Sequence, residues 1–121
     1  MATDRDAPGA AGMVVTAKPG QDCDEGGYLL HAEHWDRAFA LWTAQAEGVL
    51  LSDDHWQVIE FLRDYYQRYQ LSPPMRVLVK AIAPLLGEAK ASSRRLYQLF
   101  PDGPAKQACK IAGLPKPLSC L

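Results

Sequence analysis

The chain has 121 residues, which is enough for one domain and too short for two ordinary ones. Its 13 basic and 14 acidic side chains give a net charge of −1, which argues against a nucleic-acid binder that depends on overall charge. Hydrophobic residues make up 48% and charged residues 22% of the chain, a globular composition that excludes wholesale disorder.

The N-terminal part predicts an extension followed by a little β structure. Residues 1–12 are small and polar and are interrupted by proline and glycine, as is typical of a disordered extension. Two short apolar runs follow at 13–16 and 28–30, with the turn signals Pro19-Gly20 and Gly26-Gly27 between them. This pattern favours a small, irregular β-hairpin or meander.

The remainder of the chain predicts helices. Apolar residues recur at helical spacing over five segments, at about 33–47, 53–70, 72–86, 92–100 and 104–112. Ser52 is a good N-cap for the second segment, whose wide apolar stripe marks it as the expected central helix. Ser72-Pro73 is expected to cap and open the third, and Gly113 to end the fifth.

The last eight residues contain Pro115 and Pro117, which exclude a helix and favour an extended, semi-rigid arm. The sequence therefore predicts an α+β, predominantly helical fold, in which a small N-terminal β-hairpin packs on about five helices. One domain would span 13–113, and 114–121 would form a mobile C-terminal arm.

Two of the three cysteines lie near this arm. Cys109 falls on the last predicted helix, and Cys120 is the penultimate residue of the sequence. A terminal thiol on a stiff tether suits the delivery of sulfur into a partner's buried site, and a second thiol at the base suits its release. The plainer interpretation makes Cys109 a small buried hydrophobe and Cys120 incidental. Spacing alone leaves both interpretations open.

Charge is unevenly distributed around these thiols. Residues 1–87 carry a net charge of −5, whereas 88–121 carry +4. Lys106, Lys110 and Lys116 surround the cysteine pair and are candidates for favouring the thiolate or for binding a partner. The alternative is a set of solvated lysines on a helix-rich end.

Location follows from what the sequence lacks. No apolar run approaches the ~20 residues of a membrane helix. Asp4 and Asp6 stand where a secretory signal would have an apolar core. We therefore expect the protein to lie in the cytoplasm, where thiols are kept reduced. Cys23, Cys109 and Cys120 are also too few and too unevenly spaced for a disulfide framework.

Other functional classes have weaker support. His31, His34 and His55 lack a ligand set with zinc spacing, so we expect capping or solvated histidines and neither a metal nor a cofactor. The segments 53–70 and 74–86 can be interpreted as a DNA-binding helix-turn-helix. The second segment, however, offers only Arg76 and Lys80 as basic residues.

The C-terminal sequence closely resembles that of a known family. The segments GPAKQA (103–108) and AGLPKP (112–117), followed by Cys120, resemble the C-terminus of the DsrC/TusE family of small sulfur carriers, also called the gamma subunit of dissimilatory sulfite reductase. The segment HWQVIEFLRDYYQRYQLSP (55–73) is similar to the family's central helix and turn. The resemblance covers about residues 27–121.

This resemblance implies a sulfurtransferase-type carrier that works through a cysteine persulfide. Cys120 matches the cysteine that accepts and donates sulfur, and Cys109 matches a second cysteine found in some members. The donor would be a complex of the TusBCD/DsrEFH type. The acceptor would be either a tRNA 2-thiouridine modification enzyme or dissimilatory sulfite reductase. Neither direct nucleic-acid binding nor membrane insertion is implied.

Overall fold

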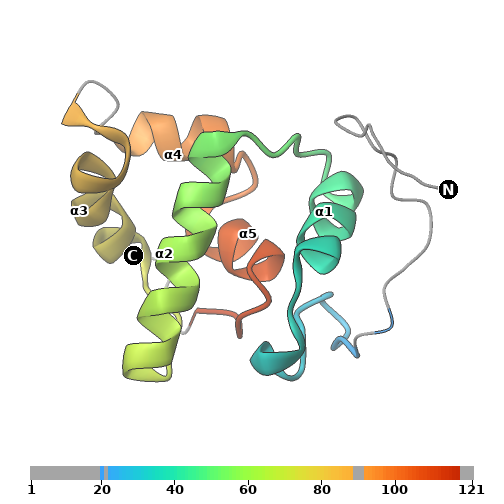
Figure 1. The fold of residues 1–121 in the computed structure, drawn as a ribbon. Coiled ribbons are helices and arrows are strands. Elements are labelled where there is room, and N and C mark those ends of the chain that lie inside the picture. The colour runs from blue at the N-terminus through green and yellow to red at the C-terminus, as the bar shows by residue number, and fades with distance from the viewer. Residues whose placement is uncertain (1–19, 21, 89–91, 118–121) are drawn as a thin grey trace, which may run out of the picture.

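The computed structural model describes residues 20, 22–88 and 92–117 and consists mainly of helices (Figure 1). A short 3-10 helix, η2, precedes five α-helices, α1 to α5. Their bounds are Ala32–His34 for η2, Arg37–Ala46 for α1, Asp53–Tyr69 for α2, Met75–Leu86 for α3, Ser93–Leu99 for α4 and Pro104–Ile111 for α5. The predicted predominantly helical architecture is confirmed.

The predicted N-terminal hairpin is not found in the part of the chain that the structure describes. One isolated antiparallel bridge joins Cys23 to Leu29, and no strand extends it. Between them, the Asp24 carboxylate accepts hydrogen bonds from the Gly26 and Tyr28 N–H groups. These backbone donors are therefore satisfied by a side chain and need no second strand. The first run of the predicted hairpin, 13–16, lies outside the described residues, as does the extension 1–12.

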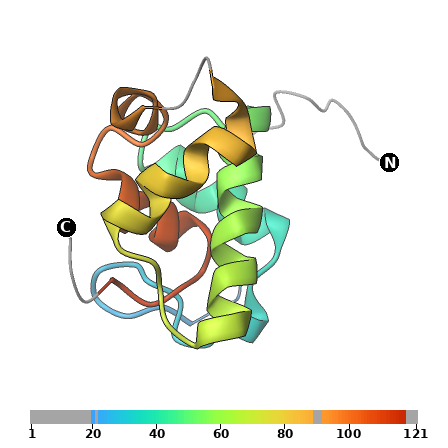
Figure 2. The ribbon, with the colours of Figure 1, turned by 90° about the vertical axis from the view of Figure 1, so that its left-hand side faces the viewer.

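Helix α5 is the centre of the fold. It contacts α1, α2, α3 and α4, and Figures 1 and 2 show it enclosed by the other helices. Its buried residues include Ala105 and Ala108, which are small and let neighbouring helices approach closely. The prediction that the 53–70 helix is central is wrong, because α2 keeps one face, including Gln57 and Glu60, in solvent.

Two helices begin later than the sequence pattern predicts. The predicted 33–47 helix is divided, because Asp36 accepts a 2.8 Å hydrogen bond from the Phe39 N–H and caps α1. The third helix begins at Met75, so the prediction that Ser72 caps it is wrong. Proline disfavours a helical conformation in the residue before it, and here two prolines, at 73 and 74, follow Ser72.

The first residues of the predicted arm are packed on the domain. Leu114 is 0% exposed and belongs to the hydrophobic core, and Pro117 is also buried, whereas Pro115 and Lys116 are exposed. An arm that leaves the surface would therefore begin after Pro117. Mobility of an arm stays a prediction, because 118–121, including Cys120, lie outside the described residues.

In the described ranges, no helix combines the length and the apolar character that crossing a membrane requires.

Candidate functional site

The end of α5 turns the chain from the central helix into the segment that leads toward Cys120. The Gly113 N–H donates to the Lys110 carbonyl at 3.3 Å, and the Leu114 N–H donates to the Cys109 carbonyl at 2.9 Å. Together with the left-handed φ of 73° at Gly113, these bonds form a Schellman motif. The buried Leu114 side chain supplies the hydrophobic contact that accompanies such motifs. The start of the arm is thus fixed to the helix that carries Cys109.

Glycine at position 113 is required by packing as well as by conformation. A Cβ atom there would lie 2.4 Å from Trp35 Cδ1 and 2.9 Å from Trp35 Cβ. Both contacts are far shorter than van der Waals distances, and they involve the indole ring and the Cβ atom that joins it to the backbone. The turn after α5 therefore fits directly against Trp35.

Distant side chains bind the last carbonyl groups of α5. Trp35 Nε1 donates to the Ile111 carbonyl at 2.9 Å, and one Arg63 nitrogen donates to the Ala112 carbonyl at 2.7 Å. A second Arg63 nitrogen donates to the Ala32 carbonyl at 3.0 Å. The Arg63 guanidinium lies 4.4 Å from the centre of the Trp35 ring. A cation at a helix C-terminus also interacts favourably with the helix dipole.

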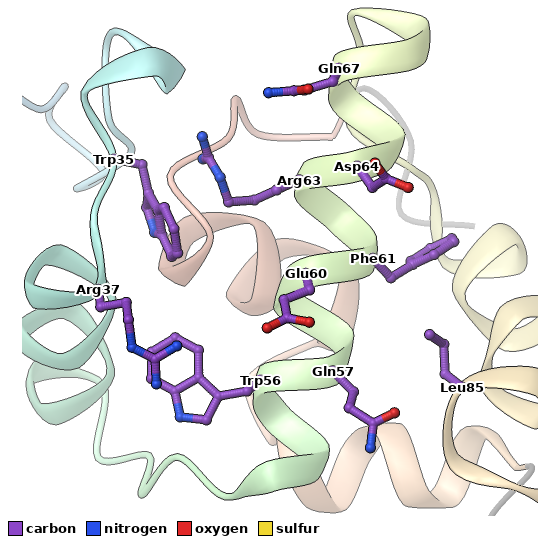
Figure 3. A pocket seen from close by; sticks show the side chains of 10 residues that line it. All are labelled: Trp35, Arg37, Trp56, Gln57, Glu60, Phe61, Arg63, Asp64, Gln67 and Leu85. Atoms are coloured by element: carbon purple, nitrogen blue, oxygen red, sulfur yellow. The ribbon is translucent and has the colours of Figure 1, made fainter.

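Trp35 and Arg63 also border a surface groove of about 690 Å³, which α2 lines along one side (Figure 3). Across the groove, the Arg37 guanidinium stacks 3.8 Å from the centre of the Trp56 ring. Glu60 projects from α2 between these two pairs (Figure 3). Tryptophan and arginine are enriched at protein interfaces, so the groove beside the end of α5 has the composition of a contact surface.

Cys109 itself is completely buried. Its side chain is 0% exposed, and burial raises the pKa of the thiol to about 12, although a hydrogen bond with Ser72 acts in the opposite direction. The thiol is therefore protonated at neutral pH. The predicted thiolate-favouring effect of the nearby lysines is not found at Cys109, because desolvation of the charged sulfur dominates.

The three candidate lysines do not act as a group. Lys110 Nζ lies 2.9 Å from Glu47 Oε2, so its charge is paired. Burial alone would raise the pKa of Glu47, but hydrogen bonds from Lys110 and Gln107 outweigh it and lower the pKa. Lys106 and Lys116 are exposed. Lys110 thus helps to hold α5 against the end of α1, and the other two are available to a partner.

Ser72 is the residue of this site that the sequence analysis missed. Its hydroxyl donates a hydrogen bond to the Pro115 carbonyl, and its interaction with the Cys109 thiol acts to lower the pKa of that group. The Ser72 side chain is nearly buried, with 8% of the residue exposed. The signal was its place directly before two prolines, which prevents Ser72 from entering the helix and leaves its hydroxyl available.

The remaining candidates are dispersed. Cys23 is half-buried at its bridge to Leu29, while His31 and His34 are exposed with ring centres 5.1 Å apart. His55 caps α2, as the sequence analysis allowed, through its Nδ1 atom, which accepts from the Ser52 N–H. Among the described residues, no three histidine, cysteine or acidic side chains gather where they could hold a metal ion.

Comparisons with known proteins identify the family. The family model described as "DsrC like protein" matches residues 17–121. "Sulfurtransferase TusE homolog" of Haemophilus influenzae is 55% identical over 100 residues, which is 83% of this chain and 92% of that protein. "Sulfurtransferase TusE" of Sodalis glossinidius is 56% identical over 98 residues, covering 81% of this chain and 91% of that protein.

Solved structures agree with these sequence matches. The solution structure of Allochromatium vinosum DsrC has a TM-score of 0.78 and 45% identity, covering 88% of this chain and 97% of that one. The oxidized DsrC gamma subunit of Archaeoglobus fulgidus dissimilatory sulfite reductase has a TM-score of 0.72 and 40% identity, covering 84% and 92%. The resemblance predicted from the sequence is confirmed, and nothing in the comparisons supports the helix-turn-helix regulator.

Proposed function

The chain belongs to the DsrC-like protein family, and we propose that it is a sulfur-relay protein that accepts sulfane sulfur from one protein and passes it to another. The observation that carries this proposal is the identity of 50% or more, across most of the chain, to proteins named sulfurtransferase. The solved DsrC structures support it through a shared fold. The protein would thus act as a carrier, with partner proteins as its substrates.

Cys120 is the proposed carrier residue. Its thiolate attacks the outer sulfur of a donor persulfide, a new S–S bond forms, and the donor leaves as a thiolate. The Cys120 persulfide then gives its outer sulfur to an acceptor thiolate by the same exchange. Each step breaks one S–S bond and forms another, so neither an oxidant nor a cofactor is needed. Cys120 is three positions after the buried Pro117, a stretch that spans at most about 10 Å and confines the thiol to the neighbourhood of this anchor.

Cys109 is proposed as a resolving thiol. Its thiolate would attack the inner sulfur of the Cys120 persulfide, forming a Cys109–Cys120 disulfide and releasing hydrosulfide. The complete burial of Cys109 means that this step requires the end of α5 or the arm to open first. Resolution would therefore wait for a partner or for an opening event, whereas loading of Cys120 would not.

The proposed partners follow the family. The donor would be a complex of the TusBCD/DsrEFH type in the cytoplasm. The higher identity to TusE proteins, 55% against 45% for the Allochromatium DsrC, favours a tRNA 2-thiouridine modification enzyme as acceptor. Dissimilatory sulfite reductase is the second candidate, since the similar Archaeoglobus fulgidus protein is the gamma subunit of that enzyme. Lys106 and Lys116 are exposed and would contribute to partner binding.

Intact-mass analysis after incubation with glutathione persulfide tests the carrier assignment. We expect the wild-type protein to gain one sulfur atom, and Cys120→Ala to gain none. Cys109→Ala and Cys23→Ala serve as matched controls and should load like the wild type. Undiminished loading of Cys120→Ala would disprove the assignment.

A further inference from the structure

A second, smaller groove of about 370 Å³ lies between α2 and α3. Along α2, the rings of Phe61, Tyr65 and Tyr69 follow one another with their centres 6.0 and 4.6 Å apart. Val77 and Ala81 line the groove from α3. We call the groove lined by these five side chains the aromatic groove. It offers a partner an apolar surface rich in tyrosine, a residue that is enriched at protein interfaces.

The aromatic groove reaches the base of the arm. Tyr69 is the last residue of α2, and Leu71 follows it in the link to α3. Both are large apolar side chains in solvent, with 57% of Tyr69 and 49% of Leu71 exposed. The hydroxyl of the next residue, Ser72, donates to the Pro115 carbonyl. Tyr69 and Leu71 therefore lie beside the segment that leads toward Cys120.

The short reach of the Cys120 thiol indicates what covers these side chains. A protein that exchanges sulfur with Cys120 must bring its own sulfur to within about 10 Å of Pro117, because only three positions separate the two residues. A stable protein contact buries about 800 Å² on each partner, far more than residues 118–121 can supply. The partner must therefore also cover the surface around the arm base, where Tyr69 and Leu71 are exposed.

The charges around the aromatic groove favour the sulfur donor over the acceptor. The carboxylate of Asp64 is 3.9 Å from Arg68, so the acidic group that lines the groove is already paired. Lys80 lines the groove from α3, and Arg76 lies one turn before it on the same face of the helix; both are exposed. A tRNA-modifying acceptor needs a positively charged surface to bind its tRNA, and these cations would repel such a surface. A donor has no such requirement.

We propose that the aromatic groove, together with Leu71, is the docking surface for the protein that donates sulfur to Cys120. The donor covers it with apolar side chains bordered by carboxylates, which pair with Lys80 and Arg76. Docking holds the donor persulfide within reach of the Cys120 thiolate, and Tyr69 and Leu71 bind the donor without touching the reacting sulfur atoms. This inference rests on the proposed function.

The test compares two ways of loading Cys120 in the full chain, each followed by intact-mass analysis. One source of sulfur is the persulfide-loaded TusBCD-type complex of the same organism, and the other is glutathione persulfide, which needs no docking surface. Tyr69→Ala and Leu71→Ala should each lower the ratio of the first rate to the second about tenfold, as truncation of an interface anchor does. Lys80→Glu should lower the ratio at low salt and less at high salt.

Matched control variants lie at the opposite end of α2. Leu50, which is 89% exposed, precedes this helix, and Tyr97, which is 51% exposed, lies on α4. An ion pair of 2.7 Å between Arg95 and Asp54 holds α4 to the first turn of α2, away from the link to α3 (Figure 1). Leu50→Ala and Tyr97→Ala therefore remove similar exposed side chains far from the arm and should keep the wild-type ratio.

A wild-type ratio in both Tyr69→Ala and Leu71→Ala would overturn the proposal, and so would equal losses in these variants and the two controls. Weaker binding of Tyr69→Ala to the tRNA modification enzyme but not to the donor would assign the groove to the acceptor instead. Sedimentation equilibrium tests the remaining occupant, since a wild-type dimer that Tyr69→Ala dissociates would assign the groove to a second copy of the chain.

Failure of the docking proposal is distinguishable from failure of the carrier assignment. If docking fails, Cys120 is still the loaded residue and the ratio of the two rates does not respond to Tyr69→Ala. If the carrier assignment fails, Cys120→Ala gains sulfur from glutathione persulfide like the wild type, and the docking proposal falls with it.

Discussion

The beginning of α2 and the end of α5 are held in opposite ways. At the start of α2, the partners are three positions apart: His55 Nδ1 accepts from the Ser52 N–H at 3.0 Å and lies 2.8 Å from the Ser52 hydroxyl. At the end of α5, the Ile111 and Ala112 carbonyls bind side chains 76 and 49 positions away. The cap of the first end can form as soon as its own turn forms, and the bond of His55 Nε2 to the Leu99 carbonyl is added only later. The bonds at the second end exist only when the whole domain has assembled.

This difference bears on the proposed function. The end of α5 carries Cys109, so the position of the Cys109 thiol depends on Trp35 and Arg63. A partner that binds the groove beside these two side chains would act directly on the support of α5 (Figure 3). Substitutions at the two helix ends separate the local contacts of α2 from the long-range contacts of α5.

The largest effect is expected from Gly113→Ala. The left-handed φ of 73° costs an alanine about 1 kcal/mol, and the contact with Trp35 adds about 2 kcal/mol of overpacking. We expect a loss of about 3 kcal/mol in the free energy of unfolding, measured by urea denaturation. Gly48→Ala is the matched control: its φ is 76°, but no atom lies within 4 Å of the added Cβ. Equal losses in the two variants would show that the approach of Trp35 does not matter.

A smaller loss is expected from Arg63→Met. The substitution leaves the Ala112 and Ala32 carbonyls without their charged donor, which costs about 2 kcal/mol in unfolding free energy. Arg68→Met on the same helix removes only an exposed ion pair of 3.9 Å with Asp64 and should cost less than about 0.5 kcal/mol. Urea denaturation of both variants under one set of conditions makes the comparison. A loss for Arg63→Met no greater than that for Arg68→Met would remove long-range capping as an explanation.

The same contrast explains what could be predicted from the sequence. The Ser52 cap and the Gly113 stop are local signals, and both predictions are confirmed. Trp35 lies in the segment 33–47, whose apolar pattern predicts a helix, but its bond to Ile111 depends on a chain path that no local pattern encodes. Ser72 was misassigned as a cap for the same reason, because its hydroxyl binds the distant Pro115 carbonyl.

The charge near Cys109 could be predicted from the sequence, but the burial of its thiol could not. The count of basic residues near the C-terminus made a stabilised thiolate one of the open interpretations, but desolvation keeps the Cys109 thiol protonated. Whether a cysteine on a short helix faces the core is decided by the helices packed around it, and α5 is surrounded by four. The family motifs identified the function from the sequence, although they do not reveal how α5 is packed.

The smallest effect concerns the locally built end and its dependence on pH. His55 Nδ1 accepts from Ser52, so the ring is neutral and its Nε2–H donates to the Leu99 carbonyl at 2.7 Å. Burial lowers the pKa of His55, an effect that the bond to Leu99 only partly offsets. Between the lowered folded value and the unfolded value of about 6.5, the unfolded chain therefore binds more protons. The contribution of neutral His55 to the free energy of unfolding is present above about pH 6.5 and is lost as the pH falls below it, by at most about 1.4 kcal/mol per pH unit.

Urea midpoints at pH 7.5 and 5.5 should differ more for the wild type than for His55→Gln, which keeps an acceptor at the third helical position but does not titrate. His31→Gln, at an exposed ring, is the control and should keep the wild-type difference. If His55→Gln keeps it as well, the pH dependence has another origin, and the start of α2 is insensitive to protonation in this range.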